Sequence, residues 1–188
     1  MKKYLSSLLV VLMISGSVLA VEASDKSAEK SKKTMAIAFN PLGLLFLTLS
    51  GSYGIAVSDK IALMVPLNLT YLSASVTYGS GKKSSDYLFG IGSGFGARFY
   101  LAGQTFDGLY LQPMGEIYWY SFGGSASALG LVGYGMLGYS WLWDSGFNLN
   151  LAGGAGYHYM STKAEAKGDL FSLTGILPAL EFSIGYAW

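Results

Sequence analysis

The sequence predicts an all-β protein: a single eight-stranded antiparallel transmembrane β-barrel whose strands follow one another in an up-and-down meander. Three observations predict this fold class. Downstream of Met35 the chain has fourteen charged residues, and eleven of them lie in gaps between apolar segments. Within those segments, large apolar residues alternate with small or polar ones, which is the period of a strand. No later segment is a run of about eighteen apolar residues, and a chain that crosses lipid without helices has to close into a barrel.

Composition narrows the classes of function. The chain has 188 residues, 26 of them glycine, and a formal net charge of +1. This charge provides no basic stripe for phosphates, so we expect no nucleic-acid partner. With one histidine and no cysteine, the chain has no metal-ligand cluster and no disulfide. We therefore expect neither a metal nor a cofactor.

The N-terminus has the three parts of a secretory signal peptide. Lys2 and Lys3 form a positive region, an apolar region follows at 5–14, and small residues close it. We expect cleavage after Ala20 or Ala23, so the signal peptide covers 1–23 at most. Residues 24–33 are a polar linker with almost nothing apolar to bury. The barrel domain is expected over 34–188.

Eight strands are expected in this domain. They lie at 34–40, 43–57, 60–78, 86–102, 107–122, 126–143, 146–161 and 170–188. Bacterial barrels have an even number of strands, short periplasmic turns and longer outer loops. The connections after the second, fourth and sixth strands are short or of modest length, and they alternate with the connections at 79–86, 123–127 and 161–169. We therefore expect the short turns and the C-terminus on the periplasmic side.

Each strand is predicted from the same alternation of large apolar residues with small or polar ones. The first and the last strand depart from this pattern. The first strand is short because Asn40-Pro41 interrupts it, and seven strands with a plug or lid are the alternative. The middle strands set large residues against small or polar ones, for example Tyr53 against Gly54, Phe95 against Gly96, Leu111 against Gln112 and Leu149 against Asn150. The last strand begins irregularly, and since Pro178 cannot donate to a ladder, we expect a bulge or bend between 170 and 178.

Three charged residues lie inside strands, and all three are expected to face the lumen. A lysine or arginine that faced lipid at mid-bilayer would cost roughly 2–4 kcal/mol. Eight strands leave an interior that side chains can fill, so Arg98, Glu116 and Glu181 predict an ion-paired plug. If the fourth turn is symmetric about Thr105, Arg98 and Glu116 lie within diagonal reach, with Glu181 at a similar height.

The inward glycines Gly90, Gly92, Gly94 and Gly96 occur at strand period with no helix after them, so they do not predict a phosphate loop. Small residues at these positions leave room for tyrosines from facing strands.

The chain ends on alternating outward residues with a terminal aromatic: Leu180, Phe182, Ile184, Tyr186 and Trp188. With the signal peptide and the alternating strands, this ending resembles the small outer-membrane β-barrel proteins of Gram-negative bacteria, the group of the OmpA barrel, OmpX, OmpW and PagL. The segment from Ala38 to Leu45, AFNPLGLL, also resembles the start of a family of small barrels with no assigned activity. The resemblance covers 34–188.

The resemblance implies an exported monomer in the outer membrane. Its implied partners are outer-membrane lipid and lipopolysaccharide, periplasmic chaperones and the barrel-insertion machinery. Phe182, Ile184, Tyr186 and Trp188 look like the signal that this machinery reads. The group hosts pores, adhesins, enzymes and structural proteins, so it leaves the activity open.

Among these activities, we expect a structural or surface-interaction role without catalysis. A small pore or a hydrophobic-ligand conduit is the alternative, and a PagL-like lipid A deacylase is the third. PagL carries a His-x-Ser pair near a glutamate. Here His158 precedes Ser161, which lies on the opposite face, so Ser172 would have to serve, with Glu165 or Glu181 as the third member.

Overall fold

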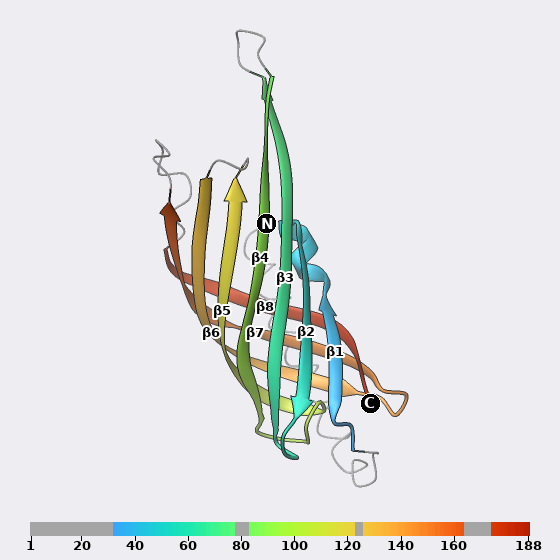
Figure 1. Cartoon of the computed structure of the whole chain (residues 1–188). Helices are drawn as coiled ribbons and strands as arrows, with labels where there is room; N and C mark the ends of the chain where they lie inside the picture. Colours follow the sequence, from blue (N-terminus) through green and yellow to red (C-terminus); the bar gives the residue numbers. More distant parts are fainter. Residues whose placement is uncertain (1–31, 78–82, 123–125, 164–173) are drawn as a thin grey trace, which may run out of the picture. The chain divides into compact units, whose positions relative to one another are not determined.

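The computed structural model describes residues 32–77, 83–122, 126–163 and 174–188. These residues form a closed barrel of eight antiparallel strands in which every strand pairs with its neighbours in the sequence (Figure 1). The all-β, eight-stranded meander that the sequence predicts is confirmed. The strands are β1 Met35–Asn40, β2 Thr48–Ala56, β3 Ile61–Thr77, β4 Lys83–Tyr100, β5 Gly108–Phe122, β6 Ala126–Leu142, β7 Phe147–Lys163 and β8 Gly175–Ala187. The expected signal peptide, most of the linker, and the expected site residues Glu165 and Ser172 lie outside the described residues.

The first strand is a full member of the barrel. β1 pairs with β2 from Met35 to Asn40 and with β8 from Ala36 to Phe39. The backbones of Met35 and Trp188 also hydrogen-bond to each other at this seam. The alternative of seven strands with a lid is therefore wrong, because β1 itself closes the barrel.

The second strand begins later than the sequence pattern predicts. Residues Pro41–Phe46 form a 3-10 helix, η2, instead of the start of a strand at 43. The Asn40 side chain caps this helix by accepting a hydrogen bond from the Leu42 N–H at 3.0 Å, and Pro41 occupies the first turn, where its missing N–H costs little. Leu47, with φ of 55°, ends the helix in the left-handed region. In the described part of the chain, no helix is long and apolar enough to cross a membrane.

The last strand is regular wherever it is described. From Gly175 to Tyr186, β8 pairs with β7 without a change of register. The bulge or bend expected near Pro178 is therefore wrong for this part, and residues 170–173 lie outside the description. At Pro178 the strand has a paired neighbour only in β7, and proline is tolerated at such an edge.

The β3–β4 hairpin continues beyond its neighbours. β2 follows β3 only as far as Thr70, and β5 follows β4 only from Leu88. Between these positions and the Thr77–Lys83 pair, β3 and β4 pair with each other alone. In Figure 1 this green hairpin extends past the ends of the other strands.

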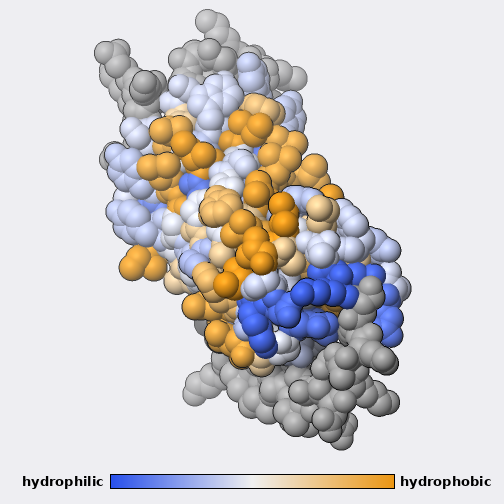
Figure 2. All heavy atoms as spheres, turned by 60° about the horizontal axis from the view of Figure 1, so that its bottom comes forward, coloured by the Kyte–Doolittle hydropathy of each residue, from blue (hydrophilic) through white to orange (hydrophobic). Residues whose placement is uncertain are grey.

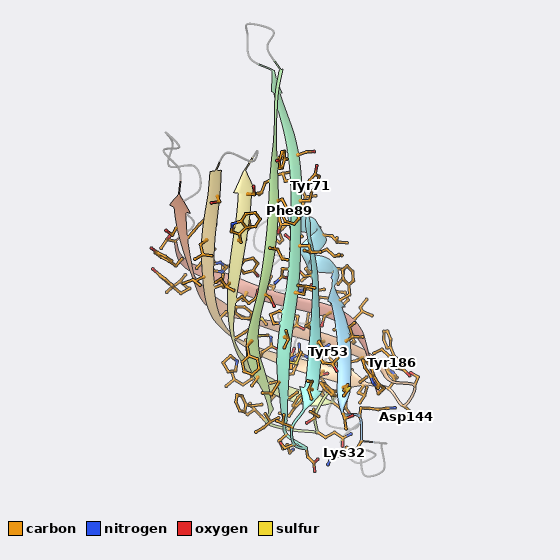
Figure 3. All side chains as sticks on the ribbon, in the orientation of Figure 1. Lys32, Tyr53, Tyr71, Phe89, Asp144 and Tyr186 are labelled. Carbon is orange, nitrogen blue, oxygen red and sulfur yellow. The ribbon has the colours of Figure 1, made fainter. Side chains whose placement is uncertain are left out.

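The two faces of the wall have opposite character. Large apolar side chains are exposed on every strand of the barrel, among them Tyr71 and Phe89, which Figure 3 labels, whereas the buried side chains include Arg98, Glu116 and Glu181. Figure 2 shows the same outside by hydropathy, with apolar residues across the middle of this face and hydrophilic residues gathered toward one end. The core of this protein is thus the lumen, and the lumen contains most of its buried polar groups.

Candidate functional site: the barrel lumen

The lumen is closed at the end where the short turns lie. The β4–β5 turn folds inward and buries Phe106, which is 1 % exposed, among the side chains of the lumen. The Phe106 carbonyl accepts hydrogen bonds from Ser140 Oγ at 2.6 Å and from Asn148 Nδ2 at 3.0 Å. Thr105 ties this turn to the β2–β3 turn, because its Oγ1 donates to the Ser58 carbonyl at 2.6 Å. We call the Thr105–Phe106 segment, with Ser140 and Asn148, the inner plug.

Next to the inner plug lies an ion pair. Arg98 on β4 donates from Nη2 to Glu181 Oε1 on β8 at 2.6 Å, and both side chains are buried. The guanidinium also donates to Gln112 Oε1 and, at 2.9 Å, to Asn150 Oδ1. Its Cζ lies 4.5 Å from the centre of the Tyr110 ring, in cation–π geometry. A buried charge needs such partners, and here they come from three strands, β5, β7 and β8.

Glu116 is held in a separate cluster. It accepts hydrogen bonds from Asn68 Nδ2 at 2.9 Å and from the hydroxyls of Tyr118 and Tyr134. These three donors are neutral, and Glu116 is only 7 % exposed. The carboxylate is therefore solvated by side chains in place of water.

The expected contact between Arg98 and Glu116 is not made among the described residues. The β4–β5 turn is centred on Thr105, as the sequence suggests, since Gly94 pairs with Glu116. This register places Gln112, not Glu116, opposite Arg98. Glu116 lies four positions along the strand from Gln112, which is about 13 Å at about 3.3 Å per residue. Arg98 instead reaches across the lumen to Glu181.

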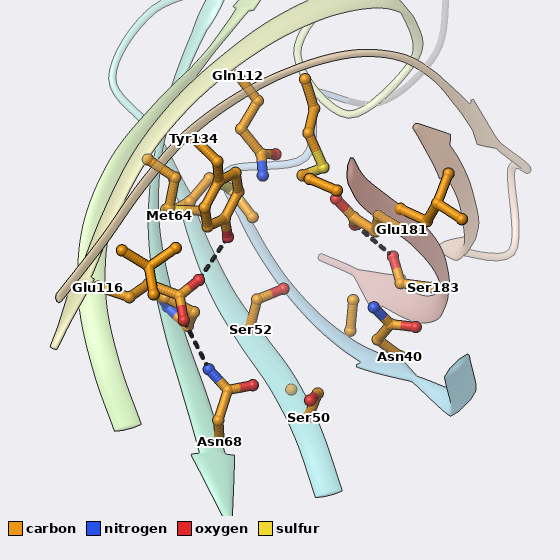
Figure 4. A pocket seen from close by; sticks show the side chains of 18 of the residues that line it. Asn40, Ser50, Ser52, Met64, Asn68, Gln112, Glu116, Tyr134, Glu181 and Ser183 are labelled. Atoms are coloured by element: carbon orange, nitrogen blue, oxygen red, sulfur yellow. Dashed lines mark hydrogen bonds between the residues drawn. The ribbon is translucent and has the colours of Figure 1, made fainter. Parts of the chain in front are cut away.

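Between the two clusters the lumen is not filled. A cavity with a volume of about 220 Å³ is lined by Glu116 and Tyr134 on one side and by Arg98 and Glu181 on another. Figure 4 shows Glu116 and Tyr134 across the cavity from Glu181, with the small residues Ser50 and Ser52 of β2 on its wall. His158 also lines it. The cavity is a candidate binding site with a buried polar lining.

Gly90 and Gly92 of β4 are needed because tyrosine rings lie against them, whereas Gly94 and Gly96 lie against the β5 backbone and the side chains of Glu116 and Met114. A Cβ on Gly92 would lie 2.3 Å from the nearest atom of the Tyr118 ring, and one on Gly90 would lie 2.6 Å from the Tyr120 ring. The two rings stack with their centres 5.9 Å apart. A third inward glycine, Gly156 on β7, would place a Cβ 2.4 Å from the Tyr134 Cβ.

The residues of the expected hydrolase triad are only partly described. His158 faces the cavity, and Glu181 is committed to Arg98 and to Ser183 Oγ, which donates to it at 2.8 Å. The described part of the chain holds no group of histidine and acidic side chains that could ligate a metal ion.

The residues of the expected insertion signal belong to the outer face of β8 and the chain end. Ile184, Tyr186 and Trp188 are exposed, Phe182 is half-buried, and the Tyr186 and Trp188 rings stack at 6.3 Å. The same end of the barrel carries two further outward aromatic pairs, Tyr139–Trp141 and Trp143–Phe147.

Several residues of the lumen were not singled out from the sequence. Asn68, Asn148 and Asn150 lie at inward positions of strands in which apolar and polar residues alternate. Their polar side chains therefore could have indicated, from the sequence, that they line the lumen. Phe106 gave none, because a single aromatic residue within a turn does not indicate whether its ring is buried.

The fold and the lumen define the class of protein to which the chain belongs: a closed eight-stranded barrel with an apolar outside, a polar lumen and one sealed end. Comparisons of the chain with models of protein families, with curated proteins and with solved structures found no match.

Proposed function

We propose that this protein is an integral outer-membrane β-barrel with a structural or surface-interaction role and without catalysis. The observation that carries the proposal is that the outer face of the barrel wall is apolar and its inner face is polar, the reverse of a soluble barrel. A soluble barrel would bury its large apolar residues inside and expose its polar ones. Here the outside is apolar and the inside polar, which suits a barrel surrounded by lipid.

The ends of the strands support the same placement. Outward aromatic pairs flank the short β6–β7 turn, at the position where amphipathic rings meet a membrane interface. The β3–β4 hairpin extends from the opposite end, where an outer-membrane barrel would display it at the cell surface. A hairpin that extends this far offers two unpaired strand edges to a partner.

The sealed end favours a structural role over a pore. Ions that entered the lumen would meet the Arg98–Glu181 pair and then the inner plug. The expected test is a planar bilayer recording with the purified, folded barrel. We expect no stepwise conductance, and reproducible single-channel steps would contradict the proposal and favour the pore.

Placement in the membrane has its own test. The whole chain, expressed in a Gram-negative host, should fractionate with the outer membrane and resist extraction by alkali. On a gel, the unheated sample should migrate differently from the boiled one, as folded barrels do. A protein that stays folded in buffer without detergent would overturn the proposal.

The cavity supports a second candidate function, the binding of an amphiphilic ligand. A fully side-chain-filled plug would leave no space of about 220 Å³ beside two buried carboxylates.

A further inference from the structure

The ladder that closes the barrel is incomplete beside β8. β1 pairs with β8 only as far as Phe39, which faces Ile184. From Gly175 to Ser183, β8 therefore has a paired neighbour strand on one side only, β7. On the open side the chain leaves β1 as η2, which packs against β2 and β8 without forming a ladder. We call the space between this part of β8 and the β1–η2 segment the side opening.

The lumen cavity reaches this side opening. Alternate residues of a strand point their side chains to opposite sides of the wall, while the backbone of any strand residue can border the lumen. The cavity is lined by Ala179, Leu180 and Glu181, which belong to the part of β8 that has no paired strand on its open side, and by Asn40, the last residue of β1. Leu180 is the outward residue among them and lies at the margin of the side opening. The cavity therefore borders the place where the ladder between β1 and β8 is incomplete.

The outer margin of the side opening is strongly apolar. Leu180 is 70 % exposed, and Leu45 and Phe46 of η2 are 76 % and 77 % exposed. The inner end is polar and carries charge. With His158 neutral, the described lumen residues Arg98, Glu116 and Glu181 sum to one negative charge (+1 − 1 − 1), and the Arg98–Glu181 pair leaves that charge on Glu116.

From this arrangement we propose that the cavity is the binding site of a single-chain cationic amphiphile. The cationic head lies in the lumen beside Glu116, where the buried carboxylate lacks a paired cation among the described residues. The apolar chain leaves through the side opening past Leu180 and lies along the outer face near η2. This inference rests on the proposed membrane placement, since the chain of the ligand needs an apolar surrounding outside the wall.

The test uses the whole processed chain, folded in alkyl maltoside micelles, and native mass spectrometry. Decyltrimethylammonium is the probe, and decyl sulfate at the same concentration is the control for chain length. We expect the wild-type barrel to retain one decyltrimethylammonium with at least tenfold preference over decyl sulfate. Glu116→Gln should lower this retention at least tenfold, because it removes the charge and keeps the size.

A second variant tests the side opening without touching the lumen. Leu180→Trp fills the opening from an exposed position, so the fold does not depend on it, and retention should fall at least tenfold. Leu137→Trp is the matched control, because Leu137 is an outward, exposed leucine on β6, away from the opening. It should retain the probe as the wild type does.

Each outcome decides one proposal. If the folded wild type retains no probe, or retains decyl sulfate equally well, the inference is wrong and the membrane placement stands. Equal effects of Leu180→Trp and Leu137→Trp would also overturn it. If the chain proves to be folded in buffer with no amphiphile, the proposed function itself fails. Circular dichroism and the heat-dependent gel shift establish in advance that every variant is folded.

Discussion

Arg98 and Glu181 form the buried ion pair on which the inner half of the lumen depends. Their side chains meet at 2.6 Å although 83 residues separate them in the chain. Removing one partner leaves the other charge buried and unpaired, a loss that is typically about 3–5 kcal/mol. We expect Arg98→Leu to lower the free energy of unfolding, measured with urea in lipid vesicles, by about this amount.

The double variant Arg98→Leu/Glu181→Leu is the control for this prediction. It removes both charges, and we expect it to recover most of the loss because no unpaired charge remains. If the single variant were as stable as the wild type, the ion pair would contribute nothing to the fold.

The variant Gly92→Ala tests how closely the glycines of β4 and the tyrosines of β5 pack together. Its missing Cβ is the space into which the Tyr118 ring packs, and Tyr118 is fixed by its hydrogen bond to Glu116. Gly92→Ala should therefore lower the free energy of unfolding by about 1–3 kcal/mol. Gly115→Ala is the matched control, since nothing lies within 4 Å of the Cβ that it adds on the outer face. Equal stability of the two variants would show that the ring can move aside.

The β4–β5 turn acts as a structural element because its Phe106 ring fills the sealed end. Phe106→Ala removes a buried ring and should cost about 3–5 kcal/mol. Phe147, also beside a turn at this end but exposed on the outer face, is the comparison. We expect Phe147→Ala to cost much less, and denaturant unfolding of both variants in the same vesicles would measure the difference. Similar costs would mean that the inner plug is not a core.

The end of the chain has two expected roles, closure of the barrel and recognition by the insertion machinery. The variants Trp188→Ala and Trp143→Ala separate these roles. Trp188 closes the barrel through backbone hydrogen bonds to Met35, while its ring stacks outside on Tyr186. Trp188→Ala keeps the backbone bonds, so we expect folding into pure vesicles at a yield close to that of the wild type. If the terminal ring is read by the insertion machinery, the same variant should accumulate poorly in cells.

Trp143→Ala is the control for Trp188→Ala, because Trp143 is another exposed aromatic residue at the same end of the barrel. Quantification of the folded band from outer membranes should show loss for the first variant and little change for the control. Equal accumulation of both would argue against a signal at the chain end.

For the molecule as a whole, the sequence predicts what depends on strand period and little that depends on how the strands are staggered. Alternation alone identifies the inward face, so the lumen positions of Arg98, Glu116 and Glu181 could be predicted. The register of β4 with β5 also follows, because a turn centred on Thr105 fixes it. The contact between Arg98 and Glu181 does not follow, since it depends on the stagger of the closed barrel, which no local pattern specifies.

The sequence-based prediction was wrong at two places, the start of β2 and the region of Pro178, and both errors have the same kind of cause. The residues of η2 are as apolar as those of a strand, so hydropathy could not distinguish them, and the Asn40-Pro41 cap was the usable signal. Pro178 suggested a break in β8, but the strand is an edge at that point and tolerates proline. In both places the structure differs from the expectation where β1 is too short to cover its neighbour.

The turn that carries Phe106 has a consequence for any molecule that occupies the cavity. Because the end with the short turns is blocked, a guest must depart by the route through which it arrived. Such a barrel can hold or report on a compound, but it cannot deliver that compound past the blocked end.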